Sequence, residues 1–485
     1  MNLVRNLTAI KNNKAMAYVI SRYIAYGIQF INSIFIAVAL GPIYLATWGF
    51  INLVWQYIAQ INFGIPYSLS VSLSIEKTNP KKMNDLMLTS LGLYLILSFF
   101  VVAIFVTLHL FGLDIGTKYD FKQYSLLVIA IALLTHFNTI FTHYFRIINR
   151  LWEIIFFQSL IPISMLLALF LSKGEALLTT VLWIILIGQL MSLFLYVTHS
   201  SISLYFPSFG FIKPLLRKGV FLFLYNVCFY FILLSMRTII SNDYNVLEFG
   251  LFTFSFTLAN SIMLLFDSFS FLIYPKTINR LNKATVPQAL HIFKLIQTYY
   301  ITSIHGVMYG CLFAFPILLR FFPAYQTVFQ SFGFIALSII FYSNCFPYSS
   351  FLTARGKERL LSVLASLILG INIALAFFLS RILHVPYQYV ILATLISYMI
   401  YNLLLCHYSY RLLKTKASVG AIIKNNFPPK LFIPYAIALL LVALEVSNWY
   451  FLFTFGIFAF FNRKEIKKIG QMGLRILHDS TIINI

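Results

Sequence analysis

Charged side chains are scarce in this chain of 485 residues, and acidic ones are scarcer still. Only 10% of the residues are charged, with 13 Asp and Glu against 35 Lys and Arg. A soluble protein of this length carries about 25% charged residues on the surfaces of two or three domains. Hydrophobic residues make up 60% of the chain, and the mean hydropathy is +0.87. The shortage of charge therefore excludes a water-soluble globular protein.

Motifs for metal binding and redox chemistry are also missing. The chain has four cysteines and nine histidines, without a C-x-x-C or an H-E-x-x-H pattern. Cys228, Cys311, Cys345 and Cys406 all lie in apolar stretches, where cysteine behaves as a small buried hydrophobe. We therefore expect no disulfide framework, no metal site and no cofactor.

Long apolar stretches are what the chain has in abundance. About twenty residues suffice to cross the hydrocarbon core of a bilayer as a helix. Fourteen apolar stretches are predicted as membrane helices, of which the last two are short: 17–40, 44–75, 86–110, 122–145, 153–172, 177–198, 218–240, 248–274, 292–319, 327–352, 360–381, 387–408, 431–446 and 449–461. The runs are continuous, whereas a β-barrel would alternate polar and apolar residues. The predicted fold class is an all-α, polytopic membrane protein.

The net charge of +22 raises the question of nucleic acid as a partner. However, 29 of the 35 basic residues fall in alternate connections, beginning with the N-terminal segment. The positive-inside rule then predicts that both termini are cytoplasmic. Because membrane orientation accounts for most of the charge, no nucleic-acid partner is expected.

Short external connections leave little room for an active site. The longest one, 111–121, is about ten residues, and the longer cytoplasmic connections carry almost no carboxylate. A membrane glycosyltransferase or polysaccharide polymerase needs external loops or carboxylates for its chemistry. We therefore predict a transporter, which is not an enzyme.

A basic, proline-containing connection at 199–217 divides six predicted helices from the next six. Gly41-Pro42 before Trp48-Gly49-Phe50 corresponds loosely to Asn242-Asp243-Tyr244 before Phe249-Gly250-Leu251. These features predict an N-terminal lobe at 1–210, a C-terminal lobe at 211–416 and two further helices with a basic tail at 417–485.

Polar side chains recur at helical spacing on the first two predicted helices of each lobe. Such stripes are expected to line a water-filled cleft between the lobes. The candidate substrate-binding residues are Arg22, Tyr26, Gln29, Asn52, Gln56, Gln60, Asn226, Tyr230, Arg237 and Asn260.

Several of these positions have alternative roles. Arg22 and Arg237 could bind an anionic head group, or they could be interfacial anchors whose long side chains reach the membrane surface. Asp267 could bind a coupling proton or sodium ion, or it could make a polar contact between helices. His136 and His143 share a helix face, and we favour neutral hydrogen bonds between helices over a proton relay.

Several segments resemble the oligosaccharide flippases of the multidrug/oligosaccharidyl-lipid/polysaccharide exporter superfamily, which translocate O-antigen and capsule repeat units. The resembling segments are Leu40-Gly41-Pro42 to Phe50, QINFGIPYSLSVSLS at 60–74, HYFRIINRLWEI at 143–154, GLFTFSFTLANSI at 250–262, YPKTINRL at 274–281 and FLTARGKERL at 351–360. The resemblance implies a MATE-like fold: two six-helix lobes around a central cleft, plus two C-terminal helices. It also implies a cationic cavity for a sugar-diphosphate head group, for which Arg22 and Arg237 are the candidates.

The expected function is translocation of undecaprenyl-diphosphate-linked oligosaccharide by alternating access, in the bacterial cytoplasmic (inner) membrane. The expected partners are this lipid-linked substrate, membrane lipid, and a polysaccharide polymerase with its chain-length machinery. One alternative is a cation-coupled multidrug antiporter of the same superfamily. A flippase for lipid II and, in a different class, a membrane polysaccharide polymerase or ligase are the others.

Overall fold

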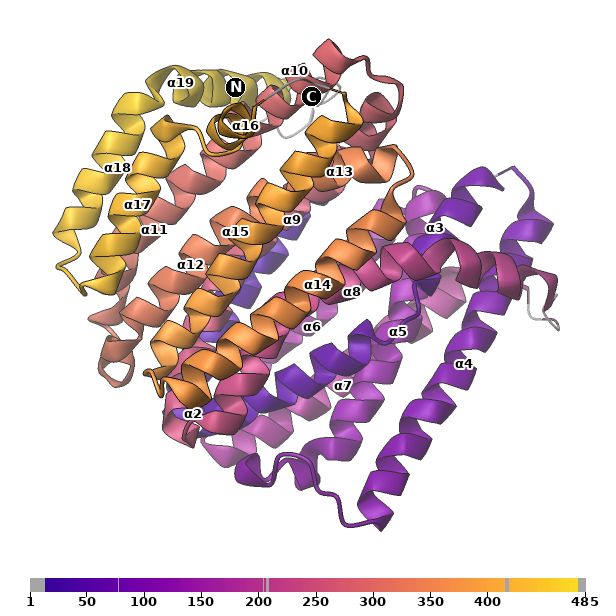
Figure 1. Cartoon of the computed structure of the whole chain (residues 1–485). Coiled ribbons are helices and arrows are strands. Elements are labelled where there is room, and N and C mark those ends of the chain that lie inside the picture. The colour runs from indigo at the N-terminus through magenta and orange to yellow at the C-terminus, as the bar shows by residue number, and fades with distance from the viewer. Residues whose placement is uncertain (1–13, 77, 204, 206–208, 415–417, 479–485) are drawn as a thin grey trace, which may run out of the picture. The chain divides into compact units, whose positions relative to one another are not determined.

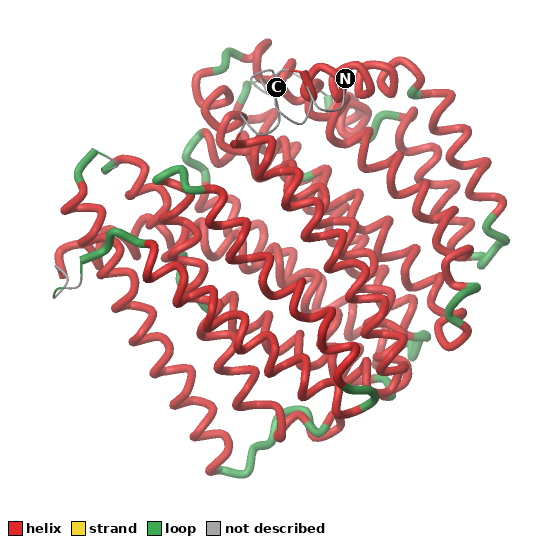
Figure 2. Tube along the Cα trace, turned by 180° about the vertical axis from the view of Figure 1, so that it is seen from behind, coloured by secondary structure: helices red, strands yellow, loops and turns green. Residues whose placement is uncertain are grey.

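The computed structural model describes residues 14–76, 78–203, 205, 209–414 and 418–478. Every regular element among these residues is a helix, and short loops join the helices (Figure 2). Eleven helices are long and apolar enough to cross a membrane, and three shorter apolar helices cover 65–75, 429–443 and 449–461. The chain is therefore a multi-pass membrane protein, and the predicted all-α fold class is confirmed.

The chain divides into two compact units. The N-terminal unit comprises Ile20–Val227 and Asn245–Gly250. The C-terminal unit comprises Cys228–Tyr244 and Leu251–Ile485, together with Met1–Val19. Helix α8 (Ile212–Asp243) runs from one unit into the other. The lobes at 1–210, 211–416 and 417–485 are defined by helix number, and they stay a prediction.

The N-terminal unit is built mainly from the helices before α8, with the first part of α8 and the start of α9. Among its helices, α2 is broken in its middle. The helices before α8 are α2 (Lys14–Gln60), α3 (Ile65–Ile75), α4 (Pro80–Leu110), α5 (Ser125–Ile147), α6 (Leu151–Leu171) and α7 (Glu175–His199). Within α2, Gly41 has φ 66° and ψ 172°, a conformation that a side chain would strain. Pro42 follows, and it cannot donate the backbone hydrogen bond that would continue the helix. The break separates the predicted stretches 17–40 and 44–75.

The second predicted stretch is itself two helices. Helix α2 ends at Gln60, and α3 begins after Gly64, which has φ 73°. Pro66 lies in the first turn of α3, where its missing N–H costs no hydrogen bond. The interruption that the sequence places at Gly64-Ile65-Pro66 is thus a helix boundary.

The C-terminal unit packs around α12, whose residues are nearly all buried. Its other helices after α8 are α9 (Val246–Lys283), α10 (Val286–Ile296), α11 (Thr302–Leu319), α13 (Phe346–Ala354), α14 (Glu358–Phe377), α15 (Tyr387–Leu412), α16 (Val419–Asn426), α17 (Pro429–Ala443), α18 (Trp449–Phe461) and α19 (Arg463–His478), with α12 at Phe329–Asn344. Figure 1 shows α10, α16 and α19 at one end of this unit.

Helices α17 and α18 attach to α11 and α12 through small residues and aromatic rings. A Cβ at Gly333 would come within 2.7 Å of Val442, and one at Gly306 within 3.1 Å of Phe458. The buried His305 ring lies 5.3 Å from the Phe432 ring. Close approach at glycine is a common way to pack helices inside a membrane. The two C-terminal helices are therefore an integral part of the C-terminal unit.

Candidate functional site

The first predicted stripe lies on the part of α2 before the Gly41 break. Gln29 is exposed on the helix surface, and Tyr26 is half-buried. Ser33 donates a hydrogen bond back to the carbonyl of Gln29 at 2.8 Å. The side chain of Arg22 lies outside the described residues, although its backbone belongs to α2. The spacing thus forms a polar helix face in which the role of Arg22 stays a prediction.

The second predicted stripe follows the break in the same helix. Asn52, Gln56 and Gln60 are all half-buried. The Asn52 amide donates to the carbonyl of Trp48 at 2.8 Å, one turn earlier. In α8, Asn226 makes the same kind of bond with the carbonyl of Leu222, at 2.7 Å. Both amides therefore return a hydrogen bond to their own helix.

Arg237 lies in the interior of the C-terminal unit and is only 2% exposed. Its guanidinium carbon lies 4.3 Å from the centroid of the Phe256 ring. A cation over an aromatic face gains about 2 kcal/mol when it is desolvated. In this structure the guanidinium therefore contacts protein and does not present itself to solvent.

Three other predicted site residues lie in the C-terminal unit: Tyr230, Asn260 and Asp267. Tyr230 and Asn260 are half-buried, on α8 and α9 respectively. The side chain of Asp267 lies outside the described residues. Its predicted role in ion coupling is therefore still a prediction.

A buried polar cluster beside Arg237 escaped the sequence analysis. The amide of Asn372 in α14 donates to the Ile232 carbonyl at 2.8 Å and to the Ser235 hydroxyl at 3.0 Å. Thr394 in α15 donates to the Asn372 side-chain oxygen at 3.2 Å. The cluster joins α8, α14 and α15 on the turn that precedes Arg237. The sequence contains one signal for this cluster. Asn372 is the one asparagine in the apolar stretch 360–381, and polar side chains in membrane helices usually face the protein interior.

Three asparagines form a second buried cluster that the sequence analysis missed. Asn344 ends α12, Asn402 lies in α15, and Asn426 ends α16. The Asn344 amide donates to the side-chain oxygens of Asn402 and Asn426, each at 3.4 Å. The Asn426 amide also donates to Asn402. Because the three residues lie far apart in sequence, no local pattern could bring them together.

Polar contacts also cross between helices inside the N-terminal unit. The imidazole Nε2 of His136 lies 3.0 Å from the carbonyl of Ile58, which confirms the predicted hydrogen bond between helices. Asn138 in α5 donates to the carbonyl of Gln189 in α7 at 3.0 Å. His143 instead contacts Arg146 on its own helix, with nitrogens 2.9 Å apart. His136 and Asn138 thus tie α5 to α2 and α7, a structural role.

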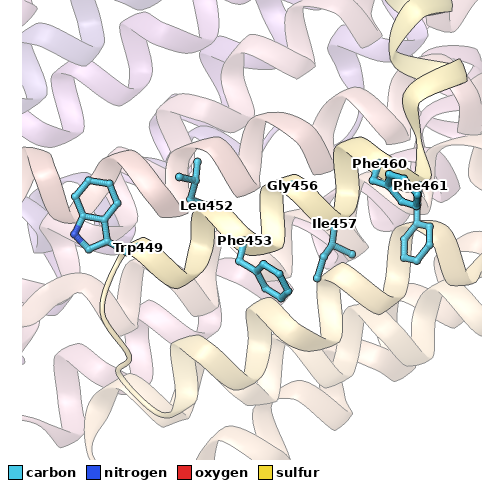
Figure 3. Close-up of a pocket in the computed structure, with 7 residues that line it drawn as sticks. All are labelled: Trp449, Leu452, Phe453, Gly456, Ile457, Phe460 and Phe461. Carbon is cyan, nitrogen blue, oxygen red and sulfur yellow. The ribbon is translucent and has the colours of Figure 1, made fainter.

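An apolar groove runs along α18 in the C-terminal unit. Its volume is about 580 Å³, and no charged residue lines it. Figure 3 shows the lining side chains from one end of the helix to the other: Trp449, Leu452, Phe453, Gly456, Ile457, Phe460 and Phe461. A helix of this length extends about 20 Å. All of its lining residues lie on one face of α18, so the groove is a shallow apolar surface of a single helix.

The described residues contain no group of three His, Cys, Asp or Glu side chains placed to hold a metal ion. What they offer are amides, hydroxyls, a buried guanidinium and the apolar groove. These groups suit binding and positioning of a ligand.

Comparisons with solved structures identify the fold. No protein-family model matches the sequence, and no curated protein sequence matches it. The fold is similar to that of the lipid II flippase MurJ in its inward closed conformation, with a TM-score of 0.62 and 16% identity. That match covers 94% of this chain and 99% of MurJ.

Transporters of the MOP superfamily share the fold as well. An outward-facing MATE family transporter of the MOP superfamily matches 83% of this chain and 95% of its own, with a TM-score of 0.57 and 14% identity. A MOP superfamily transporter from Pyrococcus furiosus matches with a TM-score of 0.51 and 15% identity, over 83% of this chain and 96% of its own. The chain therefore has the fold of MurJ and MATE transporters, as predicted.

Proposed function

We propose that this protein is a flippase of the multidrug/oligosaccharidyl-lipid/polysaccharide exporter superfamily. Its substrate is an undecaprenyl-diphosphate-linked oligosaccharide, the repeat unit of a surface polysaccharide such as O-antigen or capsule. The protein moves the head group across the bacterial cytoplasmic membrane by alternating access. Both termini face the cytoplasm, as the distribution of basic residues predicts.

The extent of the match to a flippase carries this proposal. The MurJ fold covers 94% of the chain, whereas the MATE structures cover 83 to 87%. Helices α17 and α18 correspond to the two C-terminal helices that the family resemblance adds to the two lobes. A substrate with a long lipid tail gives such additional helices a purpose, which a small soluble drug would not.

The groove along α18 supports a lipid-linked substrate. A polyprenyl tail is long, carries a methyl branch on every isoprene unit and is apolar throughout, and it stays in the bilayer while the head group crosses. The groove would hold part of this tail beside the protein, and each buried CH₂ contributes about 0.8 kcal/mol relative to water. Within lipid the gain is smaller, because it comes from packing alone.

The head group would meet the polar face of α2. We place diphosphate binding on Arg22, with Tyr26 and Gln29 as hydrogen-bonding groups for the sugar. Arg237 is the second candidate for diphosphate binding, in a conformation that opens its contact with Phe256. Proton or sodium coupling through Asp267 would drive the conformational cycle. A polymerase and its chain-length machinery would then use the translocated product.

Reconstituted vesicles test the function. Purified protein is placed in vesicles that hold an undecaprenyl-diphosphate-linked saccharide in the inner leaflet, and a sugar-modifying enzyme outside reports its arrival. We expect the protein to accelerate labelling, and Arg22→Ala and Arg237→Ala to slow it. Lys173→Ala, an exposed site elsewhere, is the matched control. Labelling at the rate of empty vesicles would refute the flippase, and normal rates in both Arg variants would refute the head-group assignment.

A cation-coupled multidrug antiporter is the second candidate, because MATE transporters share the fold. A site for cationic drugs would need carboxylates, and the whole chain has only 13 acidic residues. One of these, Asp243 at the end of α8, is bound to Arg381 through two hydrogen bonds. Uptake of a cationic dye driven by a proton or sodium gradient, without saccharide translocation, would favour this candidate.

A further inference from the structure

A basic pocket lies between the end of α9 and the start of α10, at the end of the C-terminal unit where α19 also lies (Figure 1). Its volume is about 670 Å³, within the range of small-ligand sites. The cationic and donor groups in its lining are Arg280, Lys283, Gln288 and His291. Its lining contains no carboxylate, and apolar groups such as Ile292 and Leu295 form the remainder. The lining therefore matches a ligand with both an anionic and an apolar part.

The basic side chains of the pocket are available for a ligand. Arg280, Lys283 and His291 are all exposed. In the part of the chain that is described, neither Arg280 nor Lys283 forms an ion pair with a carboxylate. The imidazole of His291 offers an N–H donor in either tautomer.

The usual structural role of basic residues in a last helical turn is already taken by another residue. Cations there stabilise the carbonyl groups at the end of a helix. At the end of α9, Arg355 fills this role, since it donates to the carbonyl of Asn282 at 3.0 Å and to that of Ala284 at 2.6 Å. Arg280 and Lys283 are therefore not needed as helix caps. Arg355 also fixes the turn that shapes the pocket.

A second basic surface adjoins the pocket through a shared apolar contact. Leu295 of the pocket and Met472 of α19 both pack against Ile273. On α19, Arg463, Lys464, Lys467 and Lys468 are exposed. This arrangement is typical of a helix that lies along a membrane surface and attracts anionic lipid.

We propose that the pocket binds the phosphate head group of an anionic glycerophospholipid, such as phosphatidylglycerol. Arg280 and Lys283 pair with the phosphate, His291 donates a hydrogen bond, and the α19 surface raises the local concentration of anionic lipid. The acyl chains leave along the apolar part of the lining. The site is a resident-lipid site at the end of the unit that the positive-inside rule predicts to be cytoplasmic, and it does not depend on the proposed substrate.

Native mass spectrometry of the full chain in neutral detergent tests this assignment. Phosphatidylglycerol is titrated against phosphatidylcholine, which has the same phosphate but no net charge. We expect Arg280→Gln/Lys283→Gln to weaken phosphatidylglycerol binding by roughly tenfold to thirtyfold. The matched control is Lys357→Gln/Arg359→Gln. This variant removes two exposed charges at the start of α14, and neither residue lines the pocket. Its affinity should stay within about twofold of the wild type.

Several outcomes would overturn the proposal. Equal losses in both double variants would mean a general effect of charge, and equal binding of both lipids would mean no head-group recognition. Displacement of the lipid by equimolar inorganic phosphate would reveal a site for a free anion. Tighter binding of undecaprenyl diphosphate than of phosphatidylglycerol would make the pocket a substrate site. If the double variant unfolds, Lys283→Gln alone should still weaken binding by about fivefold, and an unchanged affinity would refute the site.

Discussion

Two residues just after the end of α14 donate hydrogen bonds to the carboxylate of Asp243. Arg381 donates to its two oxygens at 3.0 and 2.8 Å, and Ser380 donates at 2.9 Å. The Asp243 side chain is only 9% exposed. Arg381→Ala would leave a largely buried charge with only neutral partners, the Ser380 hydroxyl and the Asn242 amide, and we expect a loss of roughly 1–3 kcal/mol of unfolding free energy. Thermal unfolding in detergent measures this loss.

Two further variants separate geometry from charge. Arg381→Lys keeps the charge but cannot donate from two positions, so we expect an intermediate loss of stability. Arg320→Ala removes an exposed arginine from another loop and should change stability by less than about 0.5 kcal/mol. Equal effects of Arg381→Ala and Arg320→Ala would show that the pair with Asp243 contributes nothing specific.

Glu465 makes the attachment of α19 sensitive to pH. Burial by itself would raise the pKa of Glu465, but the hydrogen bond from Lys430 and the charges of Lys430 and Lys468 outweigh it and lower the pKa. The Lys430 ammonium lies 2.5 Å from the carboxylate. A lowered pKa gives stability that is present above the unfolded value of about 4.3 and is lost as the pH falls through the folded value. Glu465→Gln should therefore unfold at lower temperature than the wild type at pH 7, and the difference should vanish in acid.

The size of this effect is limited by solvent. Because Lys430 is 38% exposed, we expect a contribution of no more than about 1 kcal/mol. Glu445→Gln, at an exposed turn, is the control and should not alter the pH dependence. A pH profile of Glu465→Gln that parallels the wild type would contradict the prediction.

Among the elements, the contact between α12 and α17 rests on a glycine. A Cβ on Gly333 would lie 2.7 Å from both methyl groups of Val442. Gly333→Ala should therefore push α17 away and cost roughly 1–3 kcal/mol, despite the better helix propensity of alanine. Gly310→Ala in α11 is the matched control, since no atom lies within 4 Å of its Cβ position. There we expect a gain of up to about 1 kcal/mol, so that opposite signs in thermal unfolding test the packing.

The apolar stretches of the sequence predicted which segments are helical, but they did not predict where each helix begins and ends. Apolar stretches mark the part of a helix that lies in lipid, while polar turns extend it into water. The stretch 248–274 is thus only part of α9, which continues through Pro275 to Lys283. In contrast, the break at Gly41-Pro42 was visible because glycine and proline act through the local backbone.

Polar spacing located the candidate site residues but not their partners. The positions of Asn52 and Asn226 on helix faces followed from the period of the helix. Their bonds to the preceding turn, and the contact of Arg237 with Phe256, depend on side-chain conformations and tertiary packing. The cluster around Asn372 joins three helices that are distant in sequence, which no single-sequence pattern encodes.

For the molecule as a whole, the shortage of charge determines the architecture. With so few ionised groups, helix packing relies on glycine contacts, aromatic rings and amide hydrogen bonds, which retain their strength in lipid. The basic residues are left for the ends of the helices, where they can meet phosphate. The same composition thus serves orientation, lipid contact and, as we propose, recognition of a diphosphate.

The groove along α18 is the surface on which we propose that the lipid tail lies during transport. Gly456 lines the groove, and no atom lies within 4 Å of its Cβ position. Gly456→Leu would fill this space and displace part of the tail. Because the displaced tail stays in lipid and loses only packing contacts, we expect a loss of transport rate smaller than about tenfold. Gly370→Leu on α14 is the matched control, since Gly370 is also exposed and open to a side chain. Vesicle translocation should fall only for Gly456→Leu, with thermal unfolding unchanged in both. Equal rates in the two variants would mean that the tail does not occupy the groove.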